Sequence, residues 1–559
     1  MFNKLTKLRH KHGGSQKNKE NAHLRLDGIA PYSFDNCSVS SQSSSRFSSE
    51  TGRVPSDGFA SYAETTYSES SPNQWVSSKG SSDEVLNIGD SHLPCYAEAE
   101  EKFLEDFEDY FEHLHVDNIR KEQYPKLDLQ RMVYLDHANS ALFSQYQVEQ
   151  HMRVLLEEGP NLGSVSLANA LSSNLTPYVL DTLQNLLRLF NVSNSDYGVV
   201  FTTGFTAGYR LFSEIYPFRK GTTLLTLQDN HESVKHVISA AEQHGGKCLV
   251  VPLKETDLSI SASELRRLLR RQPSHGEGGR LFVYPAQSCL SGMQHSLNWI
   301  PEVQQFGSHV LLDVSTHLPI GPLDLSVYHP EFVLGSLHHM LGYPSGMGFL
   351  LVRKKAFSVH RVSQSLRLKD VPDEGNDCHI VCEDDSINLL AFAALSFGLQ
   401  HLESVGLASI HKRVLSLMNW LIQMLKSLRH KGDERPLLQL YGSQSAKSRG
   451  NIVAFNVVDS TGNCVPASLV QKLADRSNII IGAGYFSNPG LAAVLQGGND
   501  GALDSSIFRE TVSFSSLRVS LGSVSTFSDV YRLVQFLCRF RDEDYLSFEA
   551  LDFIEDHSL

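Results

Sequence analysis

The amino-acid sequence predicts an α/β fold with a mostly parallel sheet. Between residues 198 and 352, seven short apolar runs alternate with longer segments of helical periodicity. Runs that are apolar at every position are typical of strands that helices cover on both faces. The seven expected strands are Gly198–Thr202, Leu224–Leu227, Cys248–Val251, Leu281–Tyr284, Val310–Asp313, Phe332–Gly335 and Phe349–Val352. This seven-stranded layer would form a large domain.

The chain ahead of these strands is expected to contain a tail and a helix. Residues 1–95 begin with a basic stretch, and residues 31–90 contain 18 serines and few aliphatic residues. Because this composition cannot bury enough apolar surface to offset the entropy of ordering, we expect a disordered tail. Apolar residues then recur at helical spacing and predict one amphipathic helix docked on the main body. These residues are Phe103, Phe107, Tyr110 and Leu114.

The chain after the strands is expected to form a smaller α+β domain. We place the large domain at residues 96–400, the smaller one at 401–545 and a tail at 546–559. A helix over Leu389–Leu402 would join the two domains. The other elements expected are strands at Ile452–Val458 and Leu517–Leu521 and a helix at Ser528–Phe540.

Composition argues against several classes of protein. The net charge of −13 is spread over the chain and argues against a nucleic-acid-binding surface. No run reaches the roughly 18 apolar residues of a membrane span. The eight scattered cysteines indicate a reduced, intracellular protein. The basic start lacks the apolar stretch of a secretory signal, so we expect the cytoplasm, with an organelle as the alternative.

One group of metal-ligand residue types stands out, but it is incomplete. Cys378, His379 and Cys382 lie close together, and no second ligand pair with matching spacing follows. A zinc site would need that second pair. We therefore interpret the cysteines as free thiols in a loop and expect no metal.

The segment Phe201–Ala207 has a pattern that suits phosphate. A strand, a glycine turn and a helix are expected in that order, which leaves free N–H groups at a helix N-terminus. These donors and the helix dipole attract anions. An ordinary strand–helix junction is the alternative.

Eight sequence blocks occur in the order in which one family carries them. They are Tyr134–Asn139, Phe201–Ala207, Asp229–Val234, Tyr284–Gly292, Asp313–Leu325, Ser336–Gly348, Asn478–Gly490 and Leu517–Gly522. In these blocks the chain resembles the molybdenum cofactor sulfurases, a branch of the class V aminotransferases and cysteine desulfurases that carries pyridoxal phosphate. The resemblance implies the PLP-dependent transferase fold type I and a homodimer with sites at its interface. It extends over the N-terminal half of those proteins, and we expect no molybdenum-cofactor-binding domain after it.

The resemblance also implies a set of cofactor-binding residues. They are Gly204, Phe205 and Thr206 at the phosphate, Ser336, His338 and Ser386 on the phosphate side, His231 stacked on the ring, Cys289 near the ring oxygen, and Asp313 at the pyridinium nitrogen. A structural histidine and a turn carboxylate are the alternatives for His231 and Asp313. Cys289 replaces the family's asparagine. A thiol is a weak donor, so ring binding should weaken, and a small buried apolar side chain is the favoured interpretation over a reactive thiol.

Two catalytic groups of the family are replaced in this chain. His339 stands where the resemblance implies the lysine that forms the Schiff base, and an imidazole cannot form a stable imine. Lys354 and Lys355 follow, but we expect them to face solvent. Tyr485 and Ser487 stand where the sulfurase loop has cysteines, and a hydroxyl cannot hold a persulfide.

The substrate side of the implied pocket is only partly retained. Gly482 replaces the loop arginine of the family. Arg518 matches the arginine that binds the substrate carboxylate through a two-pronged pair. A surface arginine on a strand is the alternative interpretation of Arg518.

The leading hypothesis is a catalytically impaired protein of this fold. It would hold pyridoxal phosphate or another small phosphate compound without a covalent bond. One alternative is an active transferase or desulfurase with an unusual base, such as His339. The other is a non-enzymatic interaction scaffold in which the serine-rich tail is the working part.

Overall fold

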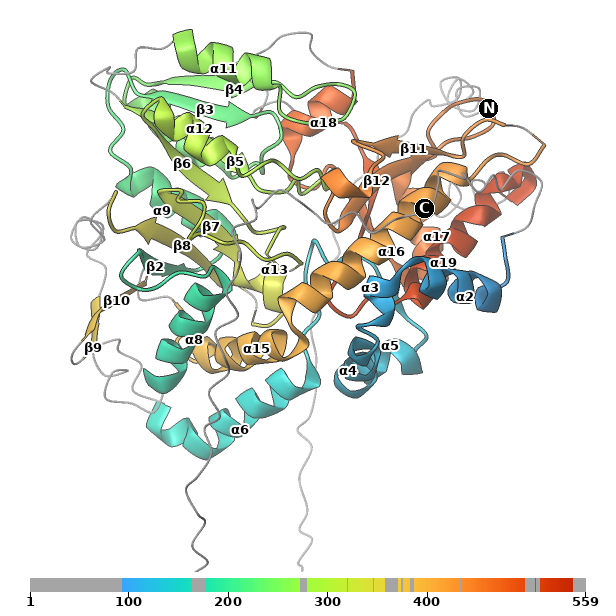
Figure 1. Cartoon of the computed structure of the whole chain (residues 1–559), viewed down its shortest axis with the longest axis horizontal. Coiled ribbons are helices and arrows are strands. Elements are labelled where there is room, and N and C mark those ends of the chain that lie inside the picture. Colours follow the sequence, from blue (N-terminus) through green and yellow to red (C-terminus); the bar gives the residue numbers. More distant parts are fainter. Residues whose placement is uncertain are drawn as a thin grey trace, which may run out of the picture. The chain divides into compact units, whose positions relative to one another are not determined.

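A nine-stranded sheet forms the centre of the large α/β layer (Figure 1). The computed structural model describes residues 93–162, 176–271, 279–356, 370–382, 387–497, 508 and 513–545, apart from positions 319, 345, 374–375 and 433. The strand order is β4-β3-β5-β6-β7-β8-β2-β10-β9. The strands are β2 (Tyr197–Thr202), β3 (Thr223–Leu227), β4 (Lys247–Val251), β5 (Arg280–Pro285), β6 (Ser308–Asp313), β7 (Phe332–Ser336), β8 (Gly348–Arg353), β9 (Asp370–Asp373) and β10 (Asn376–Cys382). All seven predicted strands are confirmed.

The sheet is mostly parallel, as predicted. Strands β4, β3, β5, β6 and β7 run parallel to one another, and β10 runs parallel to β2. Strand β8 is antiparallel to both β7 and β2, and β9 is antiparallel to β10. Gly348, the first residue of β8, therefore pairs with Thr202 and Ser336, the last residues of its two neighbours. The carboxyl ends of β2, β5, β6 and β7 meet at this edge of the sheet.

The sheet is two strands wider than the sequence predicted. Cys378, His379 and Cys382 lie in β10, so the expected loop at these residues is wrong. Strand β10 pairs with β2 in the register Ile380 to Val199. Its sequence mixes Asn, Asp and His with apolar residues, so it lacks the continuous apolar run by which the other strands were identified.

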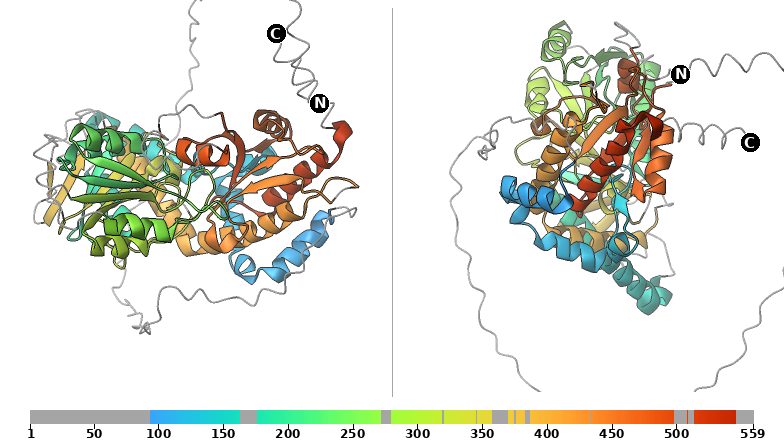
Figure 2. Two further views of the ribbon diagram at one scale, coloured as in Figure 1. Left: turned by 90° about the horizontal axis from the view of Figure 1, so that it is seen from above. Right: turned by 90° about the vertical axis from the view of Figure 1, so that its right-hand side faces the viewer.

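Alternate side chains of strands β2 to β8 enter two separate apolar clusters, one on each face of the sheet. Val200, Leu281 and Leu334 join α9 and α10 on one face. Phe201, Phe282 and Val333 join α8, α11, α12 and α15 on the other. Figure 2 shows helices on both sides of the sheet. The helices are α6 (Gln145–Leu162), α8 (Thr176–Leu189), α9 (Phe205–Ile215), α10 (Val234–Gln243), α11 (Ala262–Arg271), α12 (Trp299–Gln305), α13 (Leu337–Leu341) and α15 (Ala391–Val405).

A second, four-stranded antiparallel sheet follows in the order β11-β12-β15-β14. The strands and helices predicted in this part are confirmed within a few residues at their ends. The elements are β11 (Leu438–Tyr441), η2 (Ala446–Ser448), β12 (Ile452–Val457), β14 (Gly482–Gly484), β15 (Ser516–Ser520), α16 (Leu407–Ser427), α17 (Ala467–Arg476), α18 (Pro489–Leu495), α19 (Phe527–Leu537) and η4 (Cys538–Arg541). A short parallel pair, β1 (Val133–Tyr134) with β13 (Ile479–Ile480), ties the start of the family-like region to this sheet.

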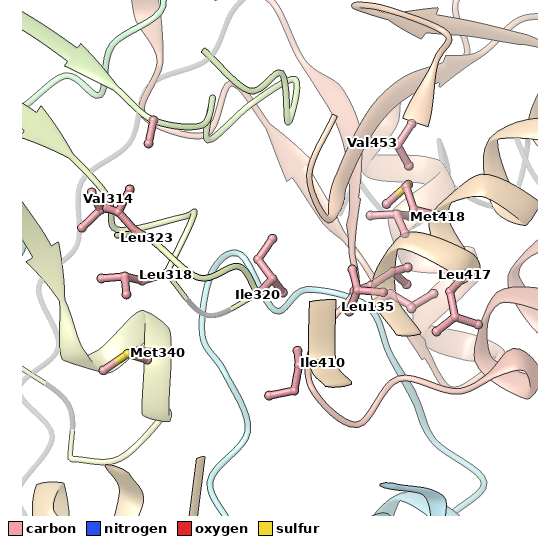
Figure 3. Packing of buried hydrophobic residues seen from close by; sticks show 14 of the residues in the cluster. Leu135, Val314, Leu318, Ile320, Leu323, Met340, Ile410, Leu417, Met418 and Val453 are labelled. Carbon is pink, nitrogen blue, oxygen red and sulfur yellow. The ribbon is translucent and has the colours of Figure 1, made fainter. Parts of the chain in front are cut away.

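The apolar core is continuous between the two sheets. Figure 3 shows Ile320, which follows β6, between Leu318 on one side and Leu135 and Ile410 of α16 on the other. All four belong to one cluster of buried residues. The chain from Ser78 onward groups into one compact unit by its internal contacts, so the division into domains at residue 400 stays a prediction.

The expected N-terminal helix is broken in two. Phe107 leaves helical geometry, with φ −127° and ψ 74°, between α2 (Tyr96–Asp106) and α3 (Glu108–Phe111). Two further helices, α4 (His115–Gln123) and α5 (Pro125–Leu129), complete the segment. It docks on α16 and α19, where the Phe103 ring stacks on that of Phe527 at 4.5 Å. Helical spacing on both sides of the break explains why one helix was expected.

Arg413 of α16 lies under these N-terminal helices and is 1% exposed. Its guanidinium lies 4.0 Å from the centre of the Tyr110 ring and donates to Asp117 at 2.5 Å. A buried arginine needs such partners, because an unpaired charge is costly away from water. None of the helices in the described part of the chain is long and apolar enough to cross a membrane.

Replacing Phe103 with alanine is expected to lower the free energy of unfolding by about 3–5 kcal/mol, because it leaves a cavity among buried rings. Urea denaturation followed by circular dichroism measures this change. Leu129→Ala, at a residue that is 82% exposed, is the control and should shift stability by no more than about 0.5 kcal/mol. Equal effects of the two substitutions would show that the helices are not docked as described.

Candidate functional site

The predicted phosphate segment lies at the edge of the large sheet where four strands end. Gly204 is the N-cap of α9, with a φ of 143° that favours glycine. Gly348 faces it across the strands: a Cβ there would lie 2.9 Å from the Gly204 carbonyl carbon and 2.8 Å from the Thr202 hydroxyl. Close backbone approach therefore requires glycine at 348, whereas the backbone conformation favours glycine at 204. The first turn of α9 opens at this edge, where its N–H groups and dipole favour an anion.

Phe205, Thr206 and His231 are brought together beside that turn. The Thr206 hydroxyl lies 2.9 Å from the Ser233 hydroxyl, and the Phe205 ring meets the His231 ring edge-on at 5.1 Å. The Nδ1 atom of His231 accepts a hydrogen bond from the Ser233 backbone N–H at 3.1 Å. Burial lowers the pKa of His231 to about 4, so the ring is neutral at physiological pH.

Asp313 ends β6 and is 5% exposed. Its Oδ1 atom accepts hydrogen bonds from the Ser315 N–H at 2.9 Å and the Ser315 hydroxyl at 2.6 Å. Burial raises the pKa of Asp313 to about 6, although these two bonds act in the opposite direction. Burial raises the pKa of the Tyr209 hydroxyl, and the neighbouring Asp313 adds to this effect. A basic ring nitrogen would supply Asp313 with a charged partner.

Cys289 lies on the other side of the site, in the turn after β5. Its thiol donates to the Phe486 carbonyl at 3.4 Å, and the Asn488 amide approaches the sulfur at 3.7 Å. Burial, with the nearby Asp229, raises the pKa of the thiol to about 12. Because the thiolate is the reactive form, this site disfavours a nucleophilic cysteine and supports the interpretation as a small buried side chain.

Asp229 is a buried carboxylate that holds several side chains on the Cys289 side of the site. The sequence analysis had assigned it no role. Asp229 is fully buried and accepts hydrogen bonds from the Ser288 hydroxyl at 2.8 Å and the Asn488 amide at 2.6 Å. Its second oxygen pairs with His295 at 3.0 Å. The side-chain oxygen Oδ1 of Asn488 in turn accepts a hydrogen bond from the Leu491 N–H and so caps α18. His295 follows the Tyr284–Gly292 block by three residues, and only the fold brings it to Asp229.

His339 lies in the short helix α13, whose N-cap Ser336 accepts a hydrogen bond from the His339 backbone N–H at 3.2 Å. The Nδ1 atoms of His338 and His339 are buried and have no hydrogen-bond partner among the described residues. Burial lowers the pKa of His339 to about 4, and His338, His231 and Arg518 act in the same direction. His339 is therefore a neutral imidazole beside the predicted phosphate segment, 6.4 Å from the Phe205 ring.

Neither Lys354 nor Lys355 can reach His339. Strand β8 begins at the site with Gly348 and runs away from it to Arg353. Five residues of extended chain span about 17 Å, so both lysines lie at the opposite edge of the sheet. The prediction that they do not replace the missing lysine is supported by this geometry.

Arg518 is buried, at 5% exposure, so its interpretation as a surface arginine is wrong. It lies on β15, a strand of the second sheet. Its guanidinium donates to Asp136 at 3.0 Å and to the Cys289 carbonyl at 2.8 Å. The Phe486 ring covers it, with 4.1 Å between the guanidinium carbon and the ring centre.

The loop that carries Tyr485 and Ser487 closes over this arginine. Phe486 and Ser487 have φ values of 52° and 51°, a left-handed conformation that is uncommon outside glycine. The Ser487 carbonyl accepts from the Glu232 N–H at 2.7 Å. A Cβ on Gly482 would lie 2.8 Å from the Phe486 ring, so that ring leaves no room for a side chain at the position of the family's loop arginine.

Ser386 lies outside the described residues. The other predicted site residues lie at the edge of the large sheet where β2, β5, β6 and β7 end, on the loop that carries Ser487, and, in the case of Arg518, on β15. Within the described ranges, no group of three or more His, Cys, Asp and Glu side chains could hold a metal ion.

Comparison with known proteins extends over most of these residues. A family model described as aminotransferase class-V matches residues 133–533. The molybdenum cofactor sulfurase of Bos taurus is 31% identical over 449 residues, which cover 72% of this chain and 50% of that one. The chain spans about half to three-fifths of the length of the curated relatives it matches.

Two solved structures are similar in fold. The cysteine desulfurase CsdA from Escherichia coli has a TM-score of 0.59 at 20% identity and covers 76% of this chain and 98% of its own. A C-DES mutant with glycine covalently linked to its PLP cofactor has a TM-score of 0.56 at 14% identity, over 75% and 98% of the two chains. These similarities confirm the predicted fold class.

Cys289 is expected to react with iodoacetamide far more slowly than Cys95 and Cys464, because its raised pKa leaves little thiolate and the other two thiols are exposed. Mass spectrometry of peptides after timed alkylation measures the three rates. In urea-unfolded protein the rates should converge. Labelling of Cys289 as fast as that of Cys464 in the native protein would contradict the raised pKa.

The free energy of unfolding is expected to rise between pH 4 and pH 6.5 in part through His339. In that window the unfolded chain binds a proton at this histidine that the native protein does not, because the native pKa is about 4 and the ordinary value is 6.5. Asp313 acts in the opposite direction, since its native pKa of about 6 lies above 3.8. The variant His339→Gln should therefore show a shallower rise of stability with pH.

Urea denaturation at a series of pH values measures this slope. His115→Gln, at an exposed histidine, is the matched control and should keep the slope of the wild-type protein. Identical slopes in wild type and His339→Gln would show that His339 is not held neutral.

Proposed function

The chain belongs to the class V aminotransferase family, and we propose that it binds pyridoxal phosphate, or a closely similar phosphate ester, without forming a covalent bond to it. The observation that carries the proposal is the position of His339. By the resemblance it stands in the place of the family's lysine, at a site where Gly204, His231 and Asp313 match the family and Cys289 replaces its asparagine. Under this proposal the chain is an impaired member of its family.

The residues of the site fit such a ligand in three respects. The first turn of α9, from Gly204 to Thr206, offers backbone N–H groups and a hydroxyl to a phosphate. His231 presents a neutral ring beside that turn, which suits stacking on an aromatic ligand. Asp313 is a buried carboxylate whose charged form a protonated ring nitrogen would stabilise. When bound in an enzyme of this family, the cofactor ring acts as an electron sink.

The site offers no primary amine that could form a Schiff base with the aldehyde of the cofactor. The neutral His339 nitrogen is not a primary amine, and Lys354 and Lys355 follow the end of β8 that lies away from the site. The buried thiol of Cys289 also offers a weaker hydrogen bond than the amide it replaces. We therefore propose weak, reversible binding through phosphate, ring face and ring nitrogen.

Sulfur transfer is not part of the proposed function. The curated relatives are named molybdenum cofactor sulfurases, and this chain spans only part of their length. At the loop that the resemblance assigns to sulfur acceptance, Ser487 provides a hydroxyl and Tyr485 a phenol in place of thiols. Because a persulfide needs a thiolate nucleophile, neither side chain can take up sulfur.

An active enzyme that uses His339 as its base is the second candidate. The neutral Nδ1 atom of His339, buried and without a partner, is the observation in its favour. A pKa of about 4 makes that imidazole a weak base at neutral pH, since efficient proton transfer needs a pKa near the working pH. We therefore place this candidate behind the non-covalent one. A homodimer, with Ser386 of one subunit near the phosphate bound by the other, remains part of the proposal.

The variant His339→Lys is expected to form a covalent bond to pyridoxal phosphate, whereas the wild-type protein binds it without one. Borohydride treatment followed by peptide mass spectrometry detects the bond, and equilibrium dialysis measures reversible binding. His338→Lys is the matched control, because it places a lysine one residue away in the same helix and should give no bond. Fixation of the ligand on any lysine of the wild-type protein, or no binding at all, would refute the proposed function.

A further inference from the structure

Arg449 is a buried cation beside the turn that carries Cys289. It is 3% exposed and lies between the short helix η2 and strand β12 of the second sheet. Burial lowers its pKa to about 10, so the guanidinium keeps its charge at neutral pH. Buried charges are usually paired with an opposite charge, but no carboxylate of the described residues pairs with Arg449. Backbone carbonyls bind it instead.

Four carbonyl groups meet at this guanidinium. The Nη2 atom of Arg449 donates to the carbonyls of Tyr441 and Ser443, each at 2.7 Å. The Nη1 atom donates to the Ile452 carbonyl at 3.3 Å and also to the carbonyl of Ser291. The first three carbonyls belong to β11, β12 and the chain between them, whereas Ser291 lies in the turn after β5 of the large sheet. The side chain of Arg449 therefore joins the second sheet to that turn.

From Ser291 a series of hydrogen bonds leads into the site. The Ser291 backbone N–H donates to the Ser288 hydroxyl at 3.1 Å, and that hydroxyl donates to Asp229 at 2.8 Å. Cys289 lies between the two serines in the sequence, and its thiol donates to the Phe486 carbonyl. A displacement of the Ser291 carbonyl would therefore move both the Cys289 thiol and the hydroxyl that binds Asp229.

We infer that Arg449 is a positioning residue of the ligand site, where it fixes the Ser288–Gly292 turn and thereby the place of Cys289 beside the ligand ring. The inference rests on the proposed function for the identity of that ligand. Arginine suits this role because its donors point in fixed directions at several carbonyls, whereas the three donors of lysine share one atom. Arg449→Lys keeps a basic side chain but leaves part of the carbonyl set without a donor, so the turn should loosen.

Two measurements on the full-length protein test the inference. In equilibrium dialysis, Arg449→Lys should bind pyridoxal phosphate about tenfold more weakly than the wild-type protein, because the ring side of the site is displaced. The affinity for inorganic phosphate, which probes only the first turn of α9, should stay unchanged. In the native protein without ligand, alkylation of Cys289 by iodoacetamide should become about tenfold faster, because a loosened turn admits water and reagent to the thiol.

Arg280→Lys is the matched control. Arg280 is 5% exposed, and its guanidinium donates to the carbonyls of Leu269 at 3.1 Å and Phe306 at 3.2 Å. It begins β5, at the end of that strand opposite to the turn. Its replacement should lower the free energy of unfolding but change neither ligand affinity nor the alkylation rate of Cys289. If Arg449→Lys does not fold, Arg449→Gln is the second variant, because a neutral amide is less costly to bury than a charge.

Three results would overturn the inference. The first is an unchanged alkylation rate of Cys289 in a folded Arg449 variant. The second is an equal rise of that rate in Arg280→Lys, which would indicate a general loss of stability. The third is a fall in the affinity for inorganic phosphate as large as that for pyridoxal phosphate. The alkylation measurement needs no ligand, so failure of the proposed function and failure of this inference can be told apart.

Discussion

The site depends on how closely the backbone of β8 approaches that of α9. Gly348 lies between the ends of β2 and β7, where a Cβ would meet the backbone of Gly204, and Gly204 itself has a φ of 143° that favours glycine. This approach is what brings the first turn of α9, the end of β6 and the short helix α13 to a common edge. Because the antiparallel β8 starts at that edge, its own lysines are carried to the other side of the sheet. The same geometry builds the pocket and leaves it without an amine.

The buried groups around the pocket have complementary electrostatic roles. His231 and His339 are held neutral, Asp313 has a raised pKa of about 6, and Arg518 has its own carboxylate partner. The site retains attraction for a phosphate at the helix terminus, where the donors are backbone N–H groups that no substitution of side chains removes.

Much of the large sheet could be predicted, because its strands are buried on both faces and their sequences are apolar throughout. Strands β9 and β10 could not, because their polar residues hide the pattern. Most site residues were found through short blocks in a fixed order. Their contacts were not: the pairing of Arg518 with Asp136 joins residues 382 positions apart, and the bond from Asn488 to Asp229 joins residues 259 apart. No local pattern encodes such distances. Tyr209 was missed since it looks like one more apolar residue of α9.

The helices that precede residue 133 are part of the folded unit. The family match starts at β1, yet Arg413, deep in α16, has Tyr110 and Asp117 as partners and both come from the earlier helices. A shortened protein that began at residue 133 would leave the Arg413 guanidinium without these partners in an apolar layer. It would also expose the rings of Phe527 and Trp420. The smallest piece able to stand alone therefore starts some forty residues upstream of the matched region, near Tyr96.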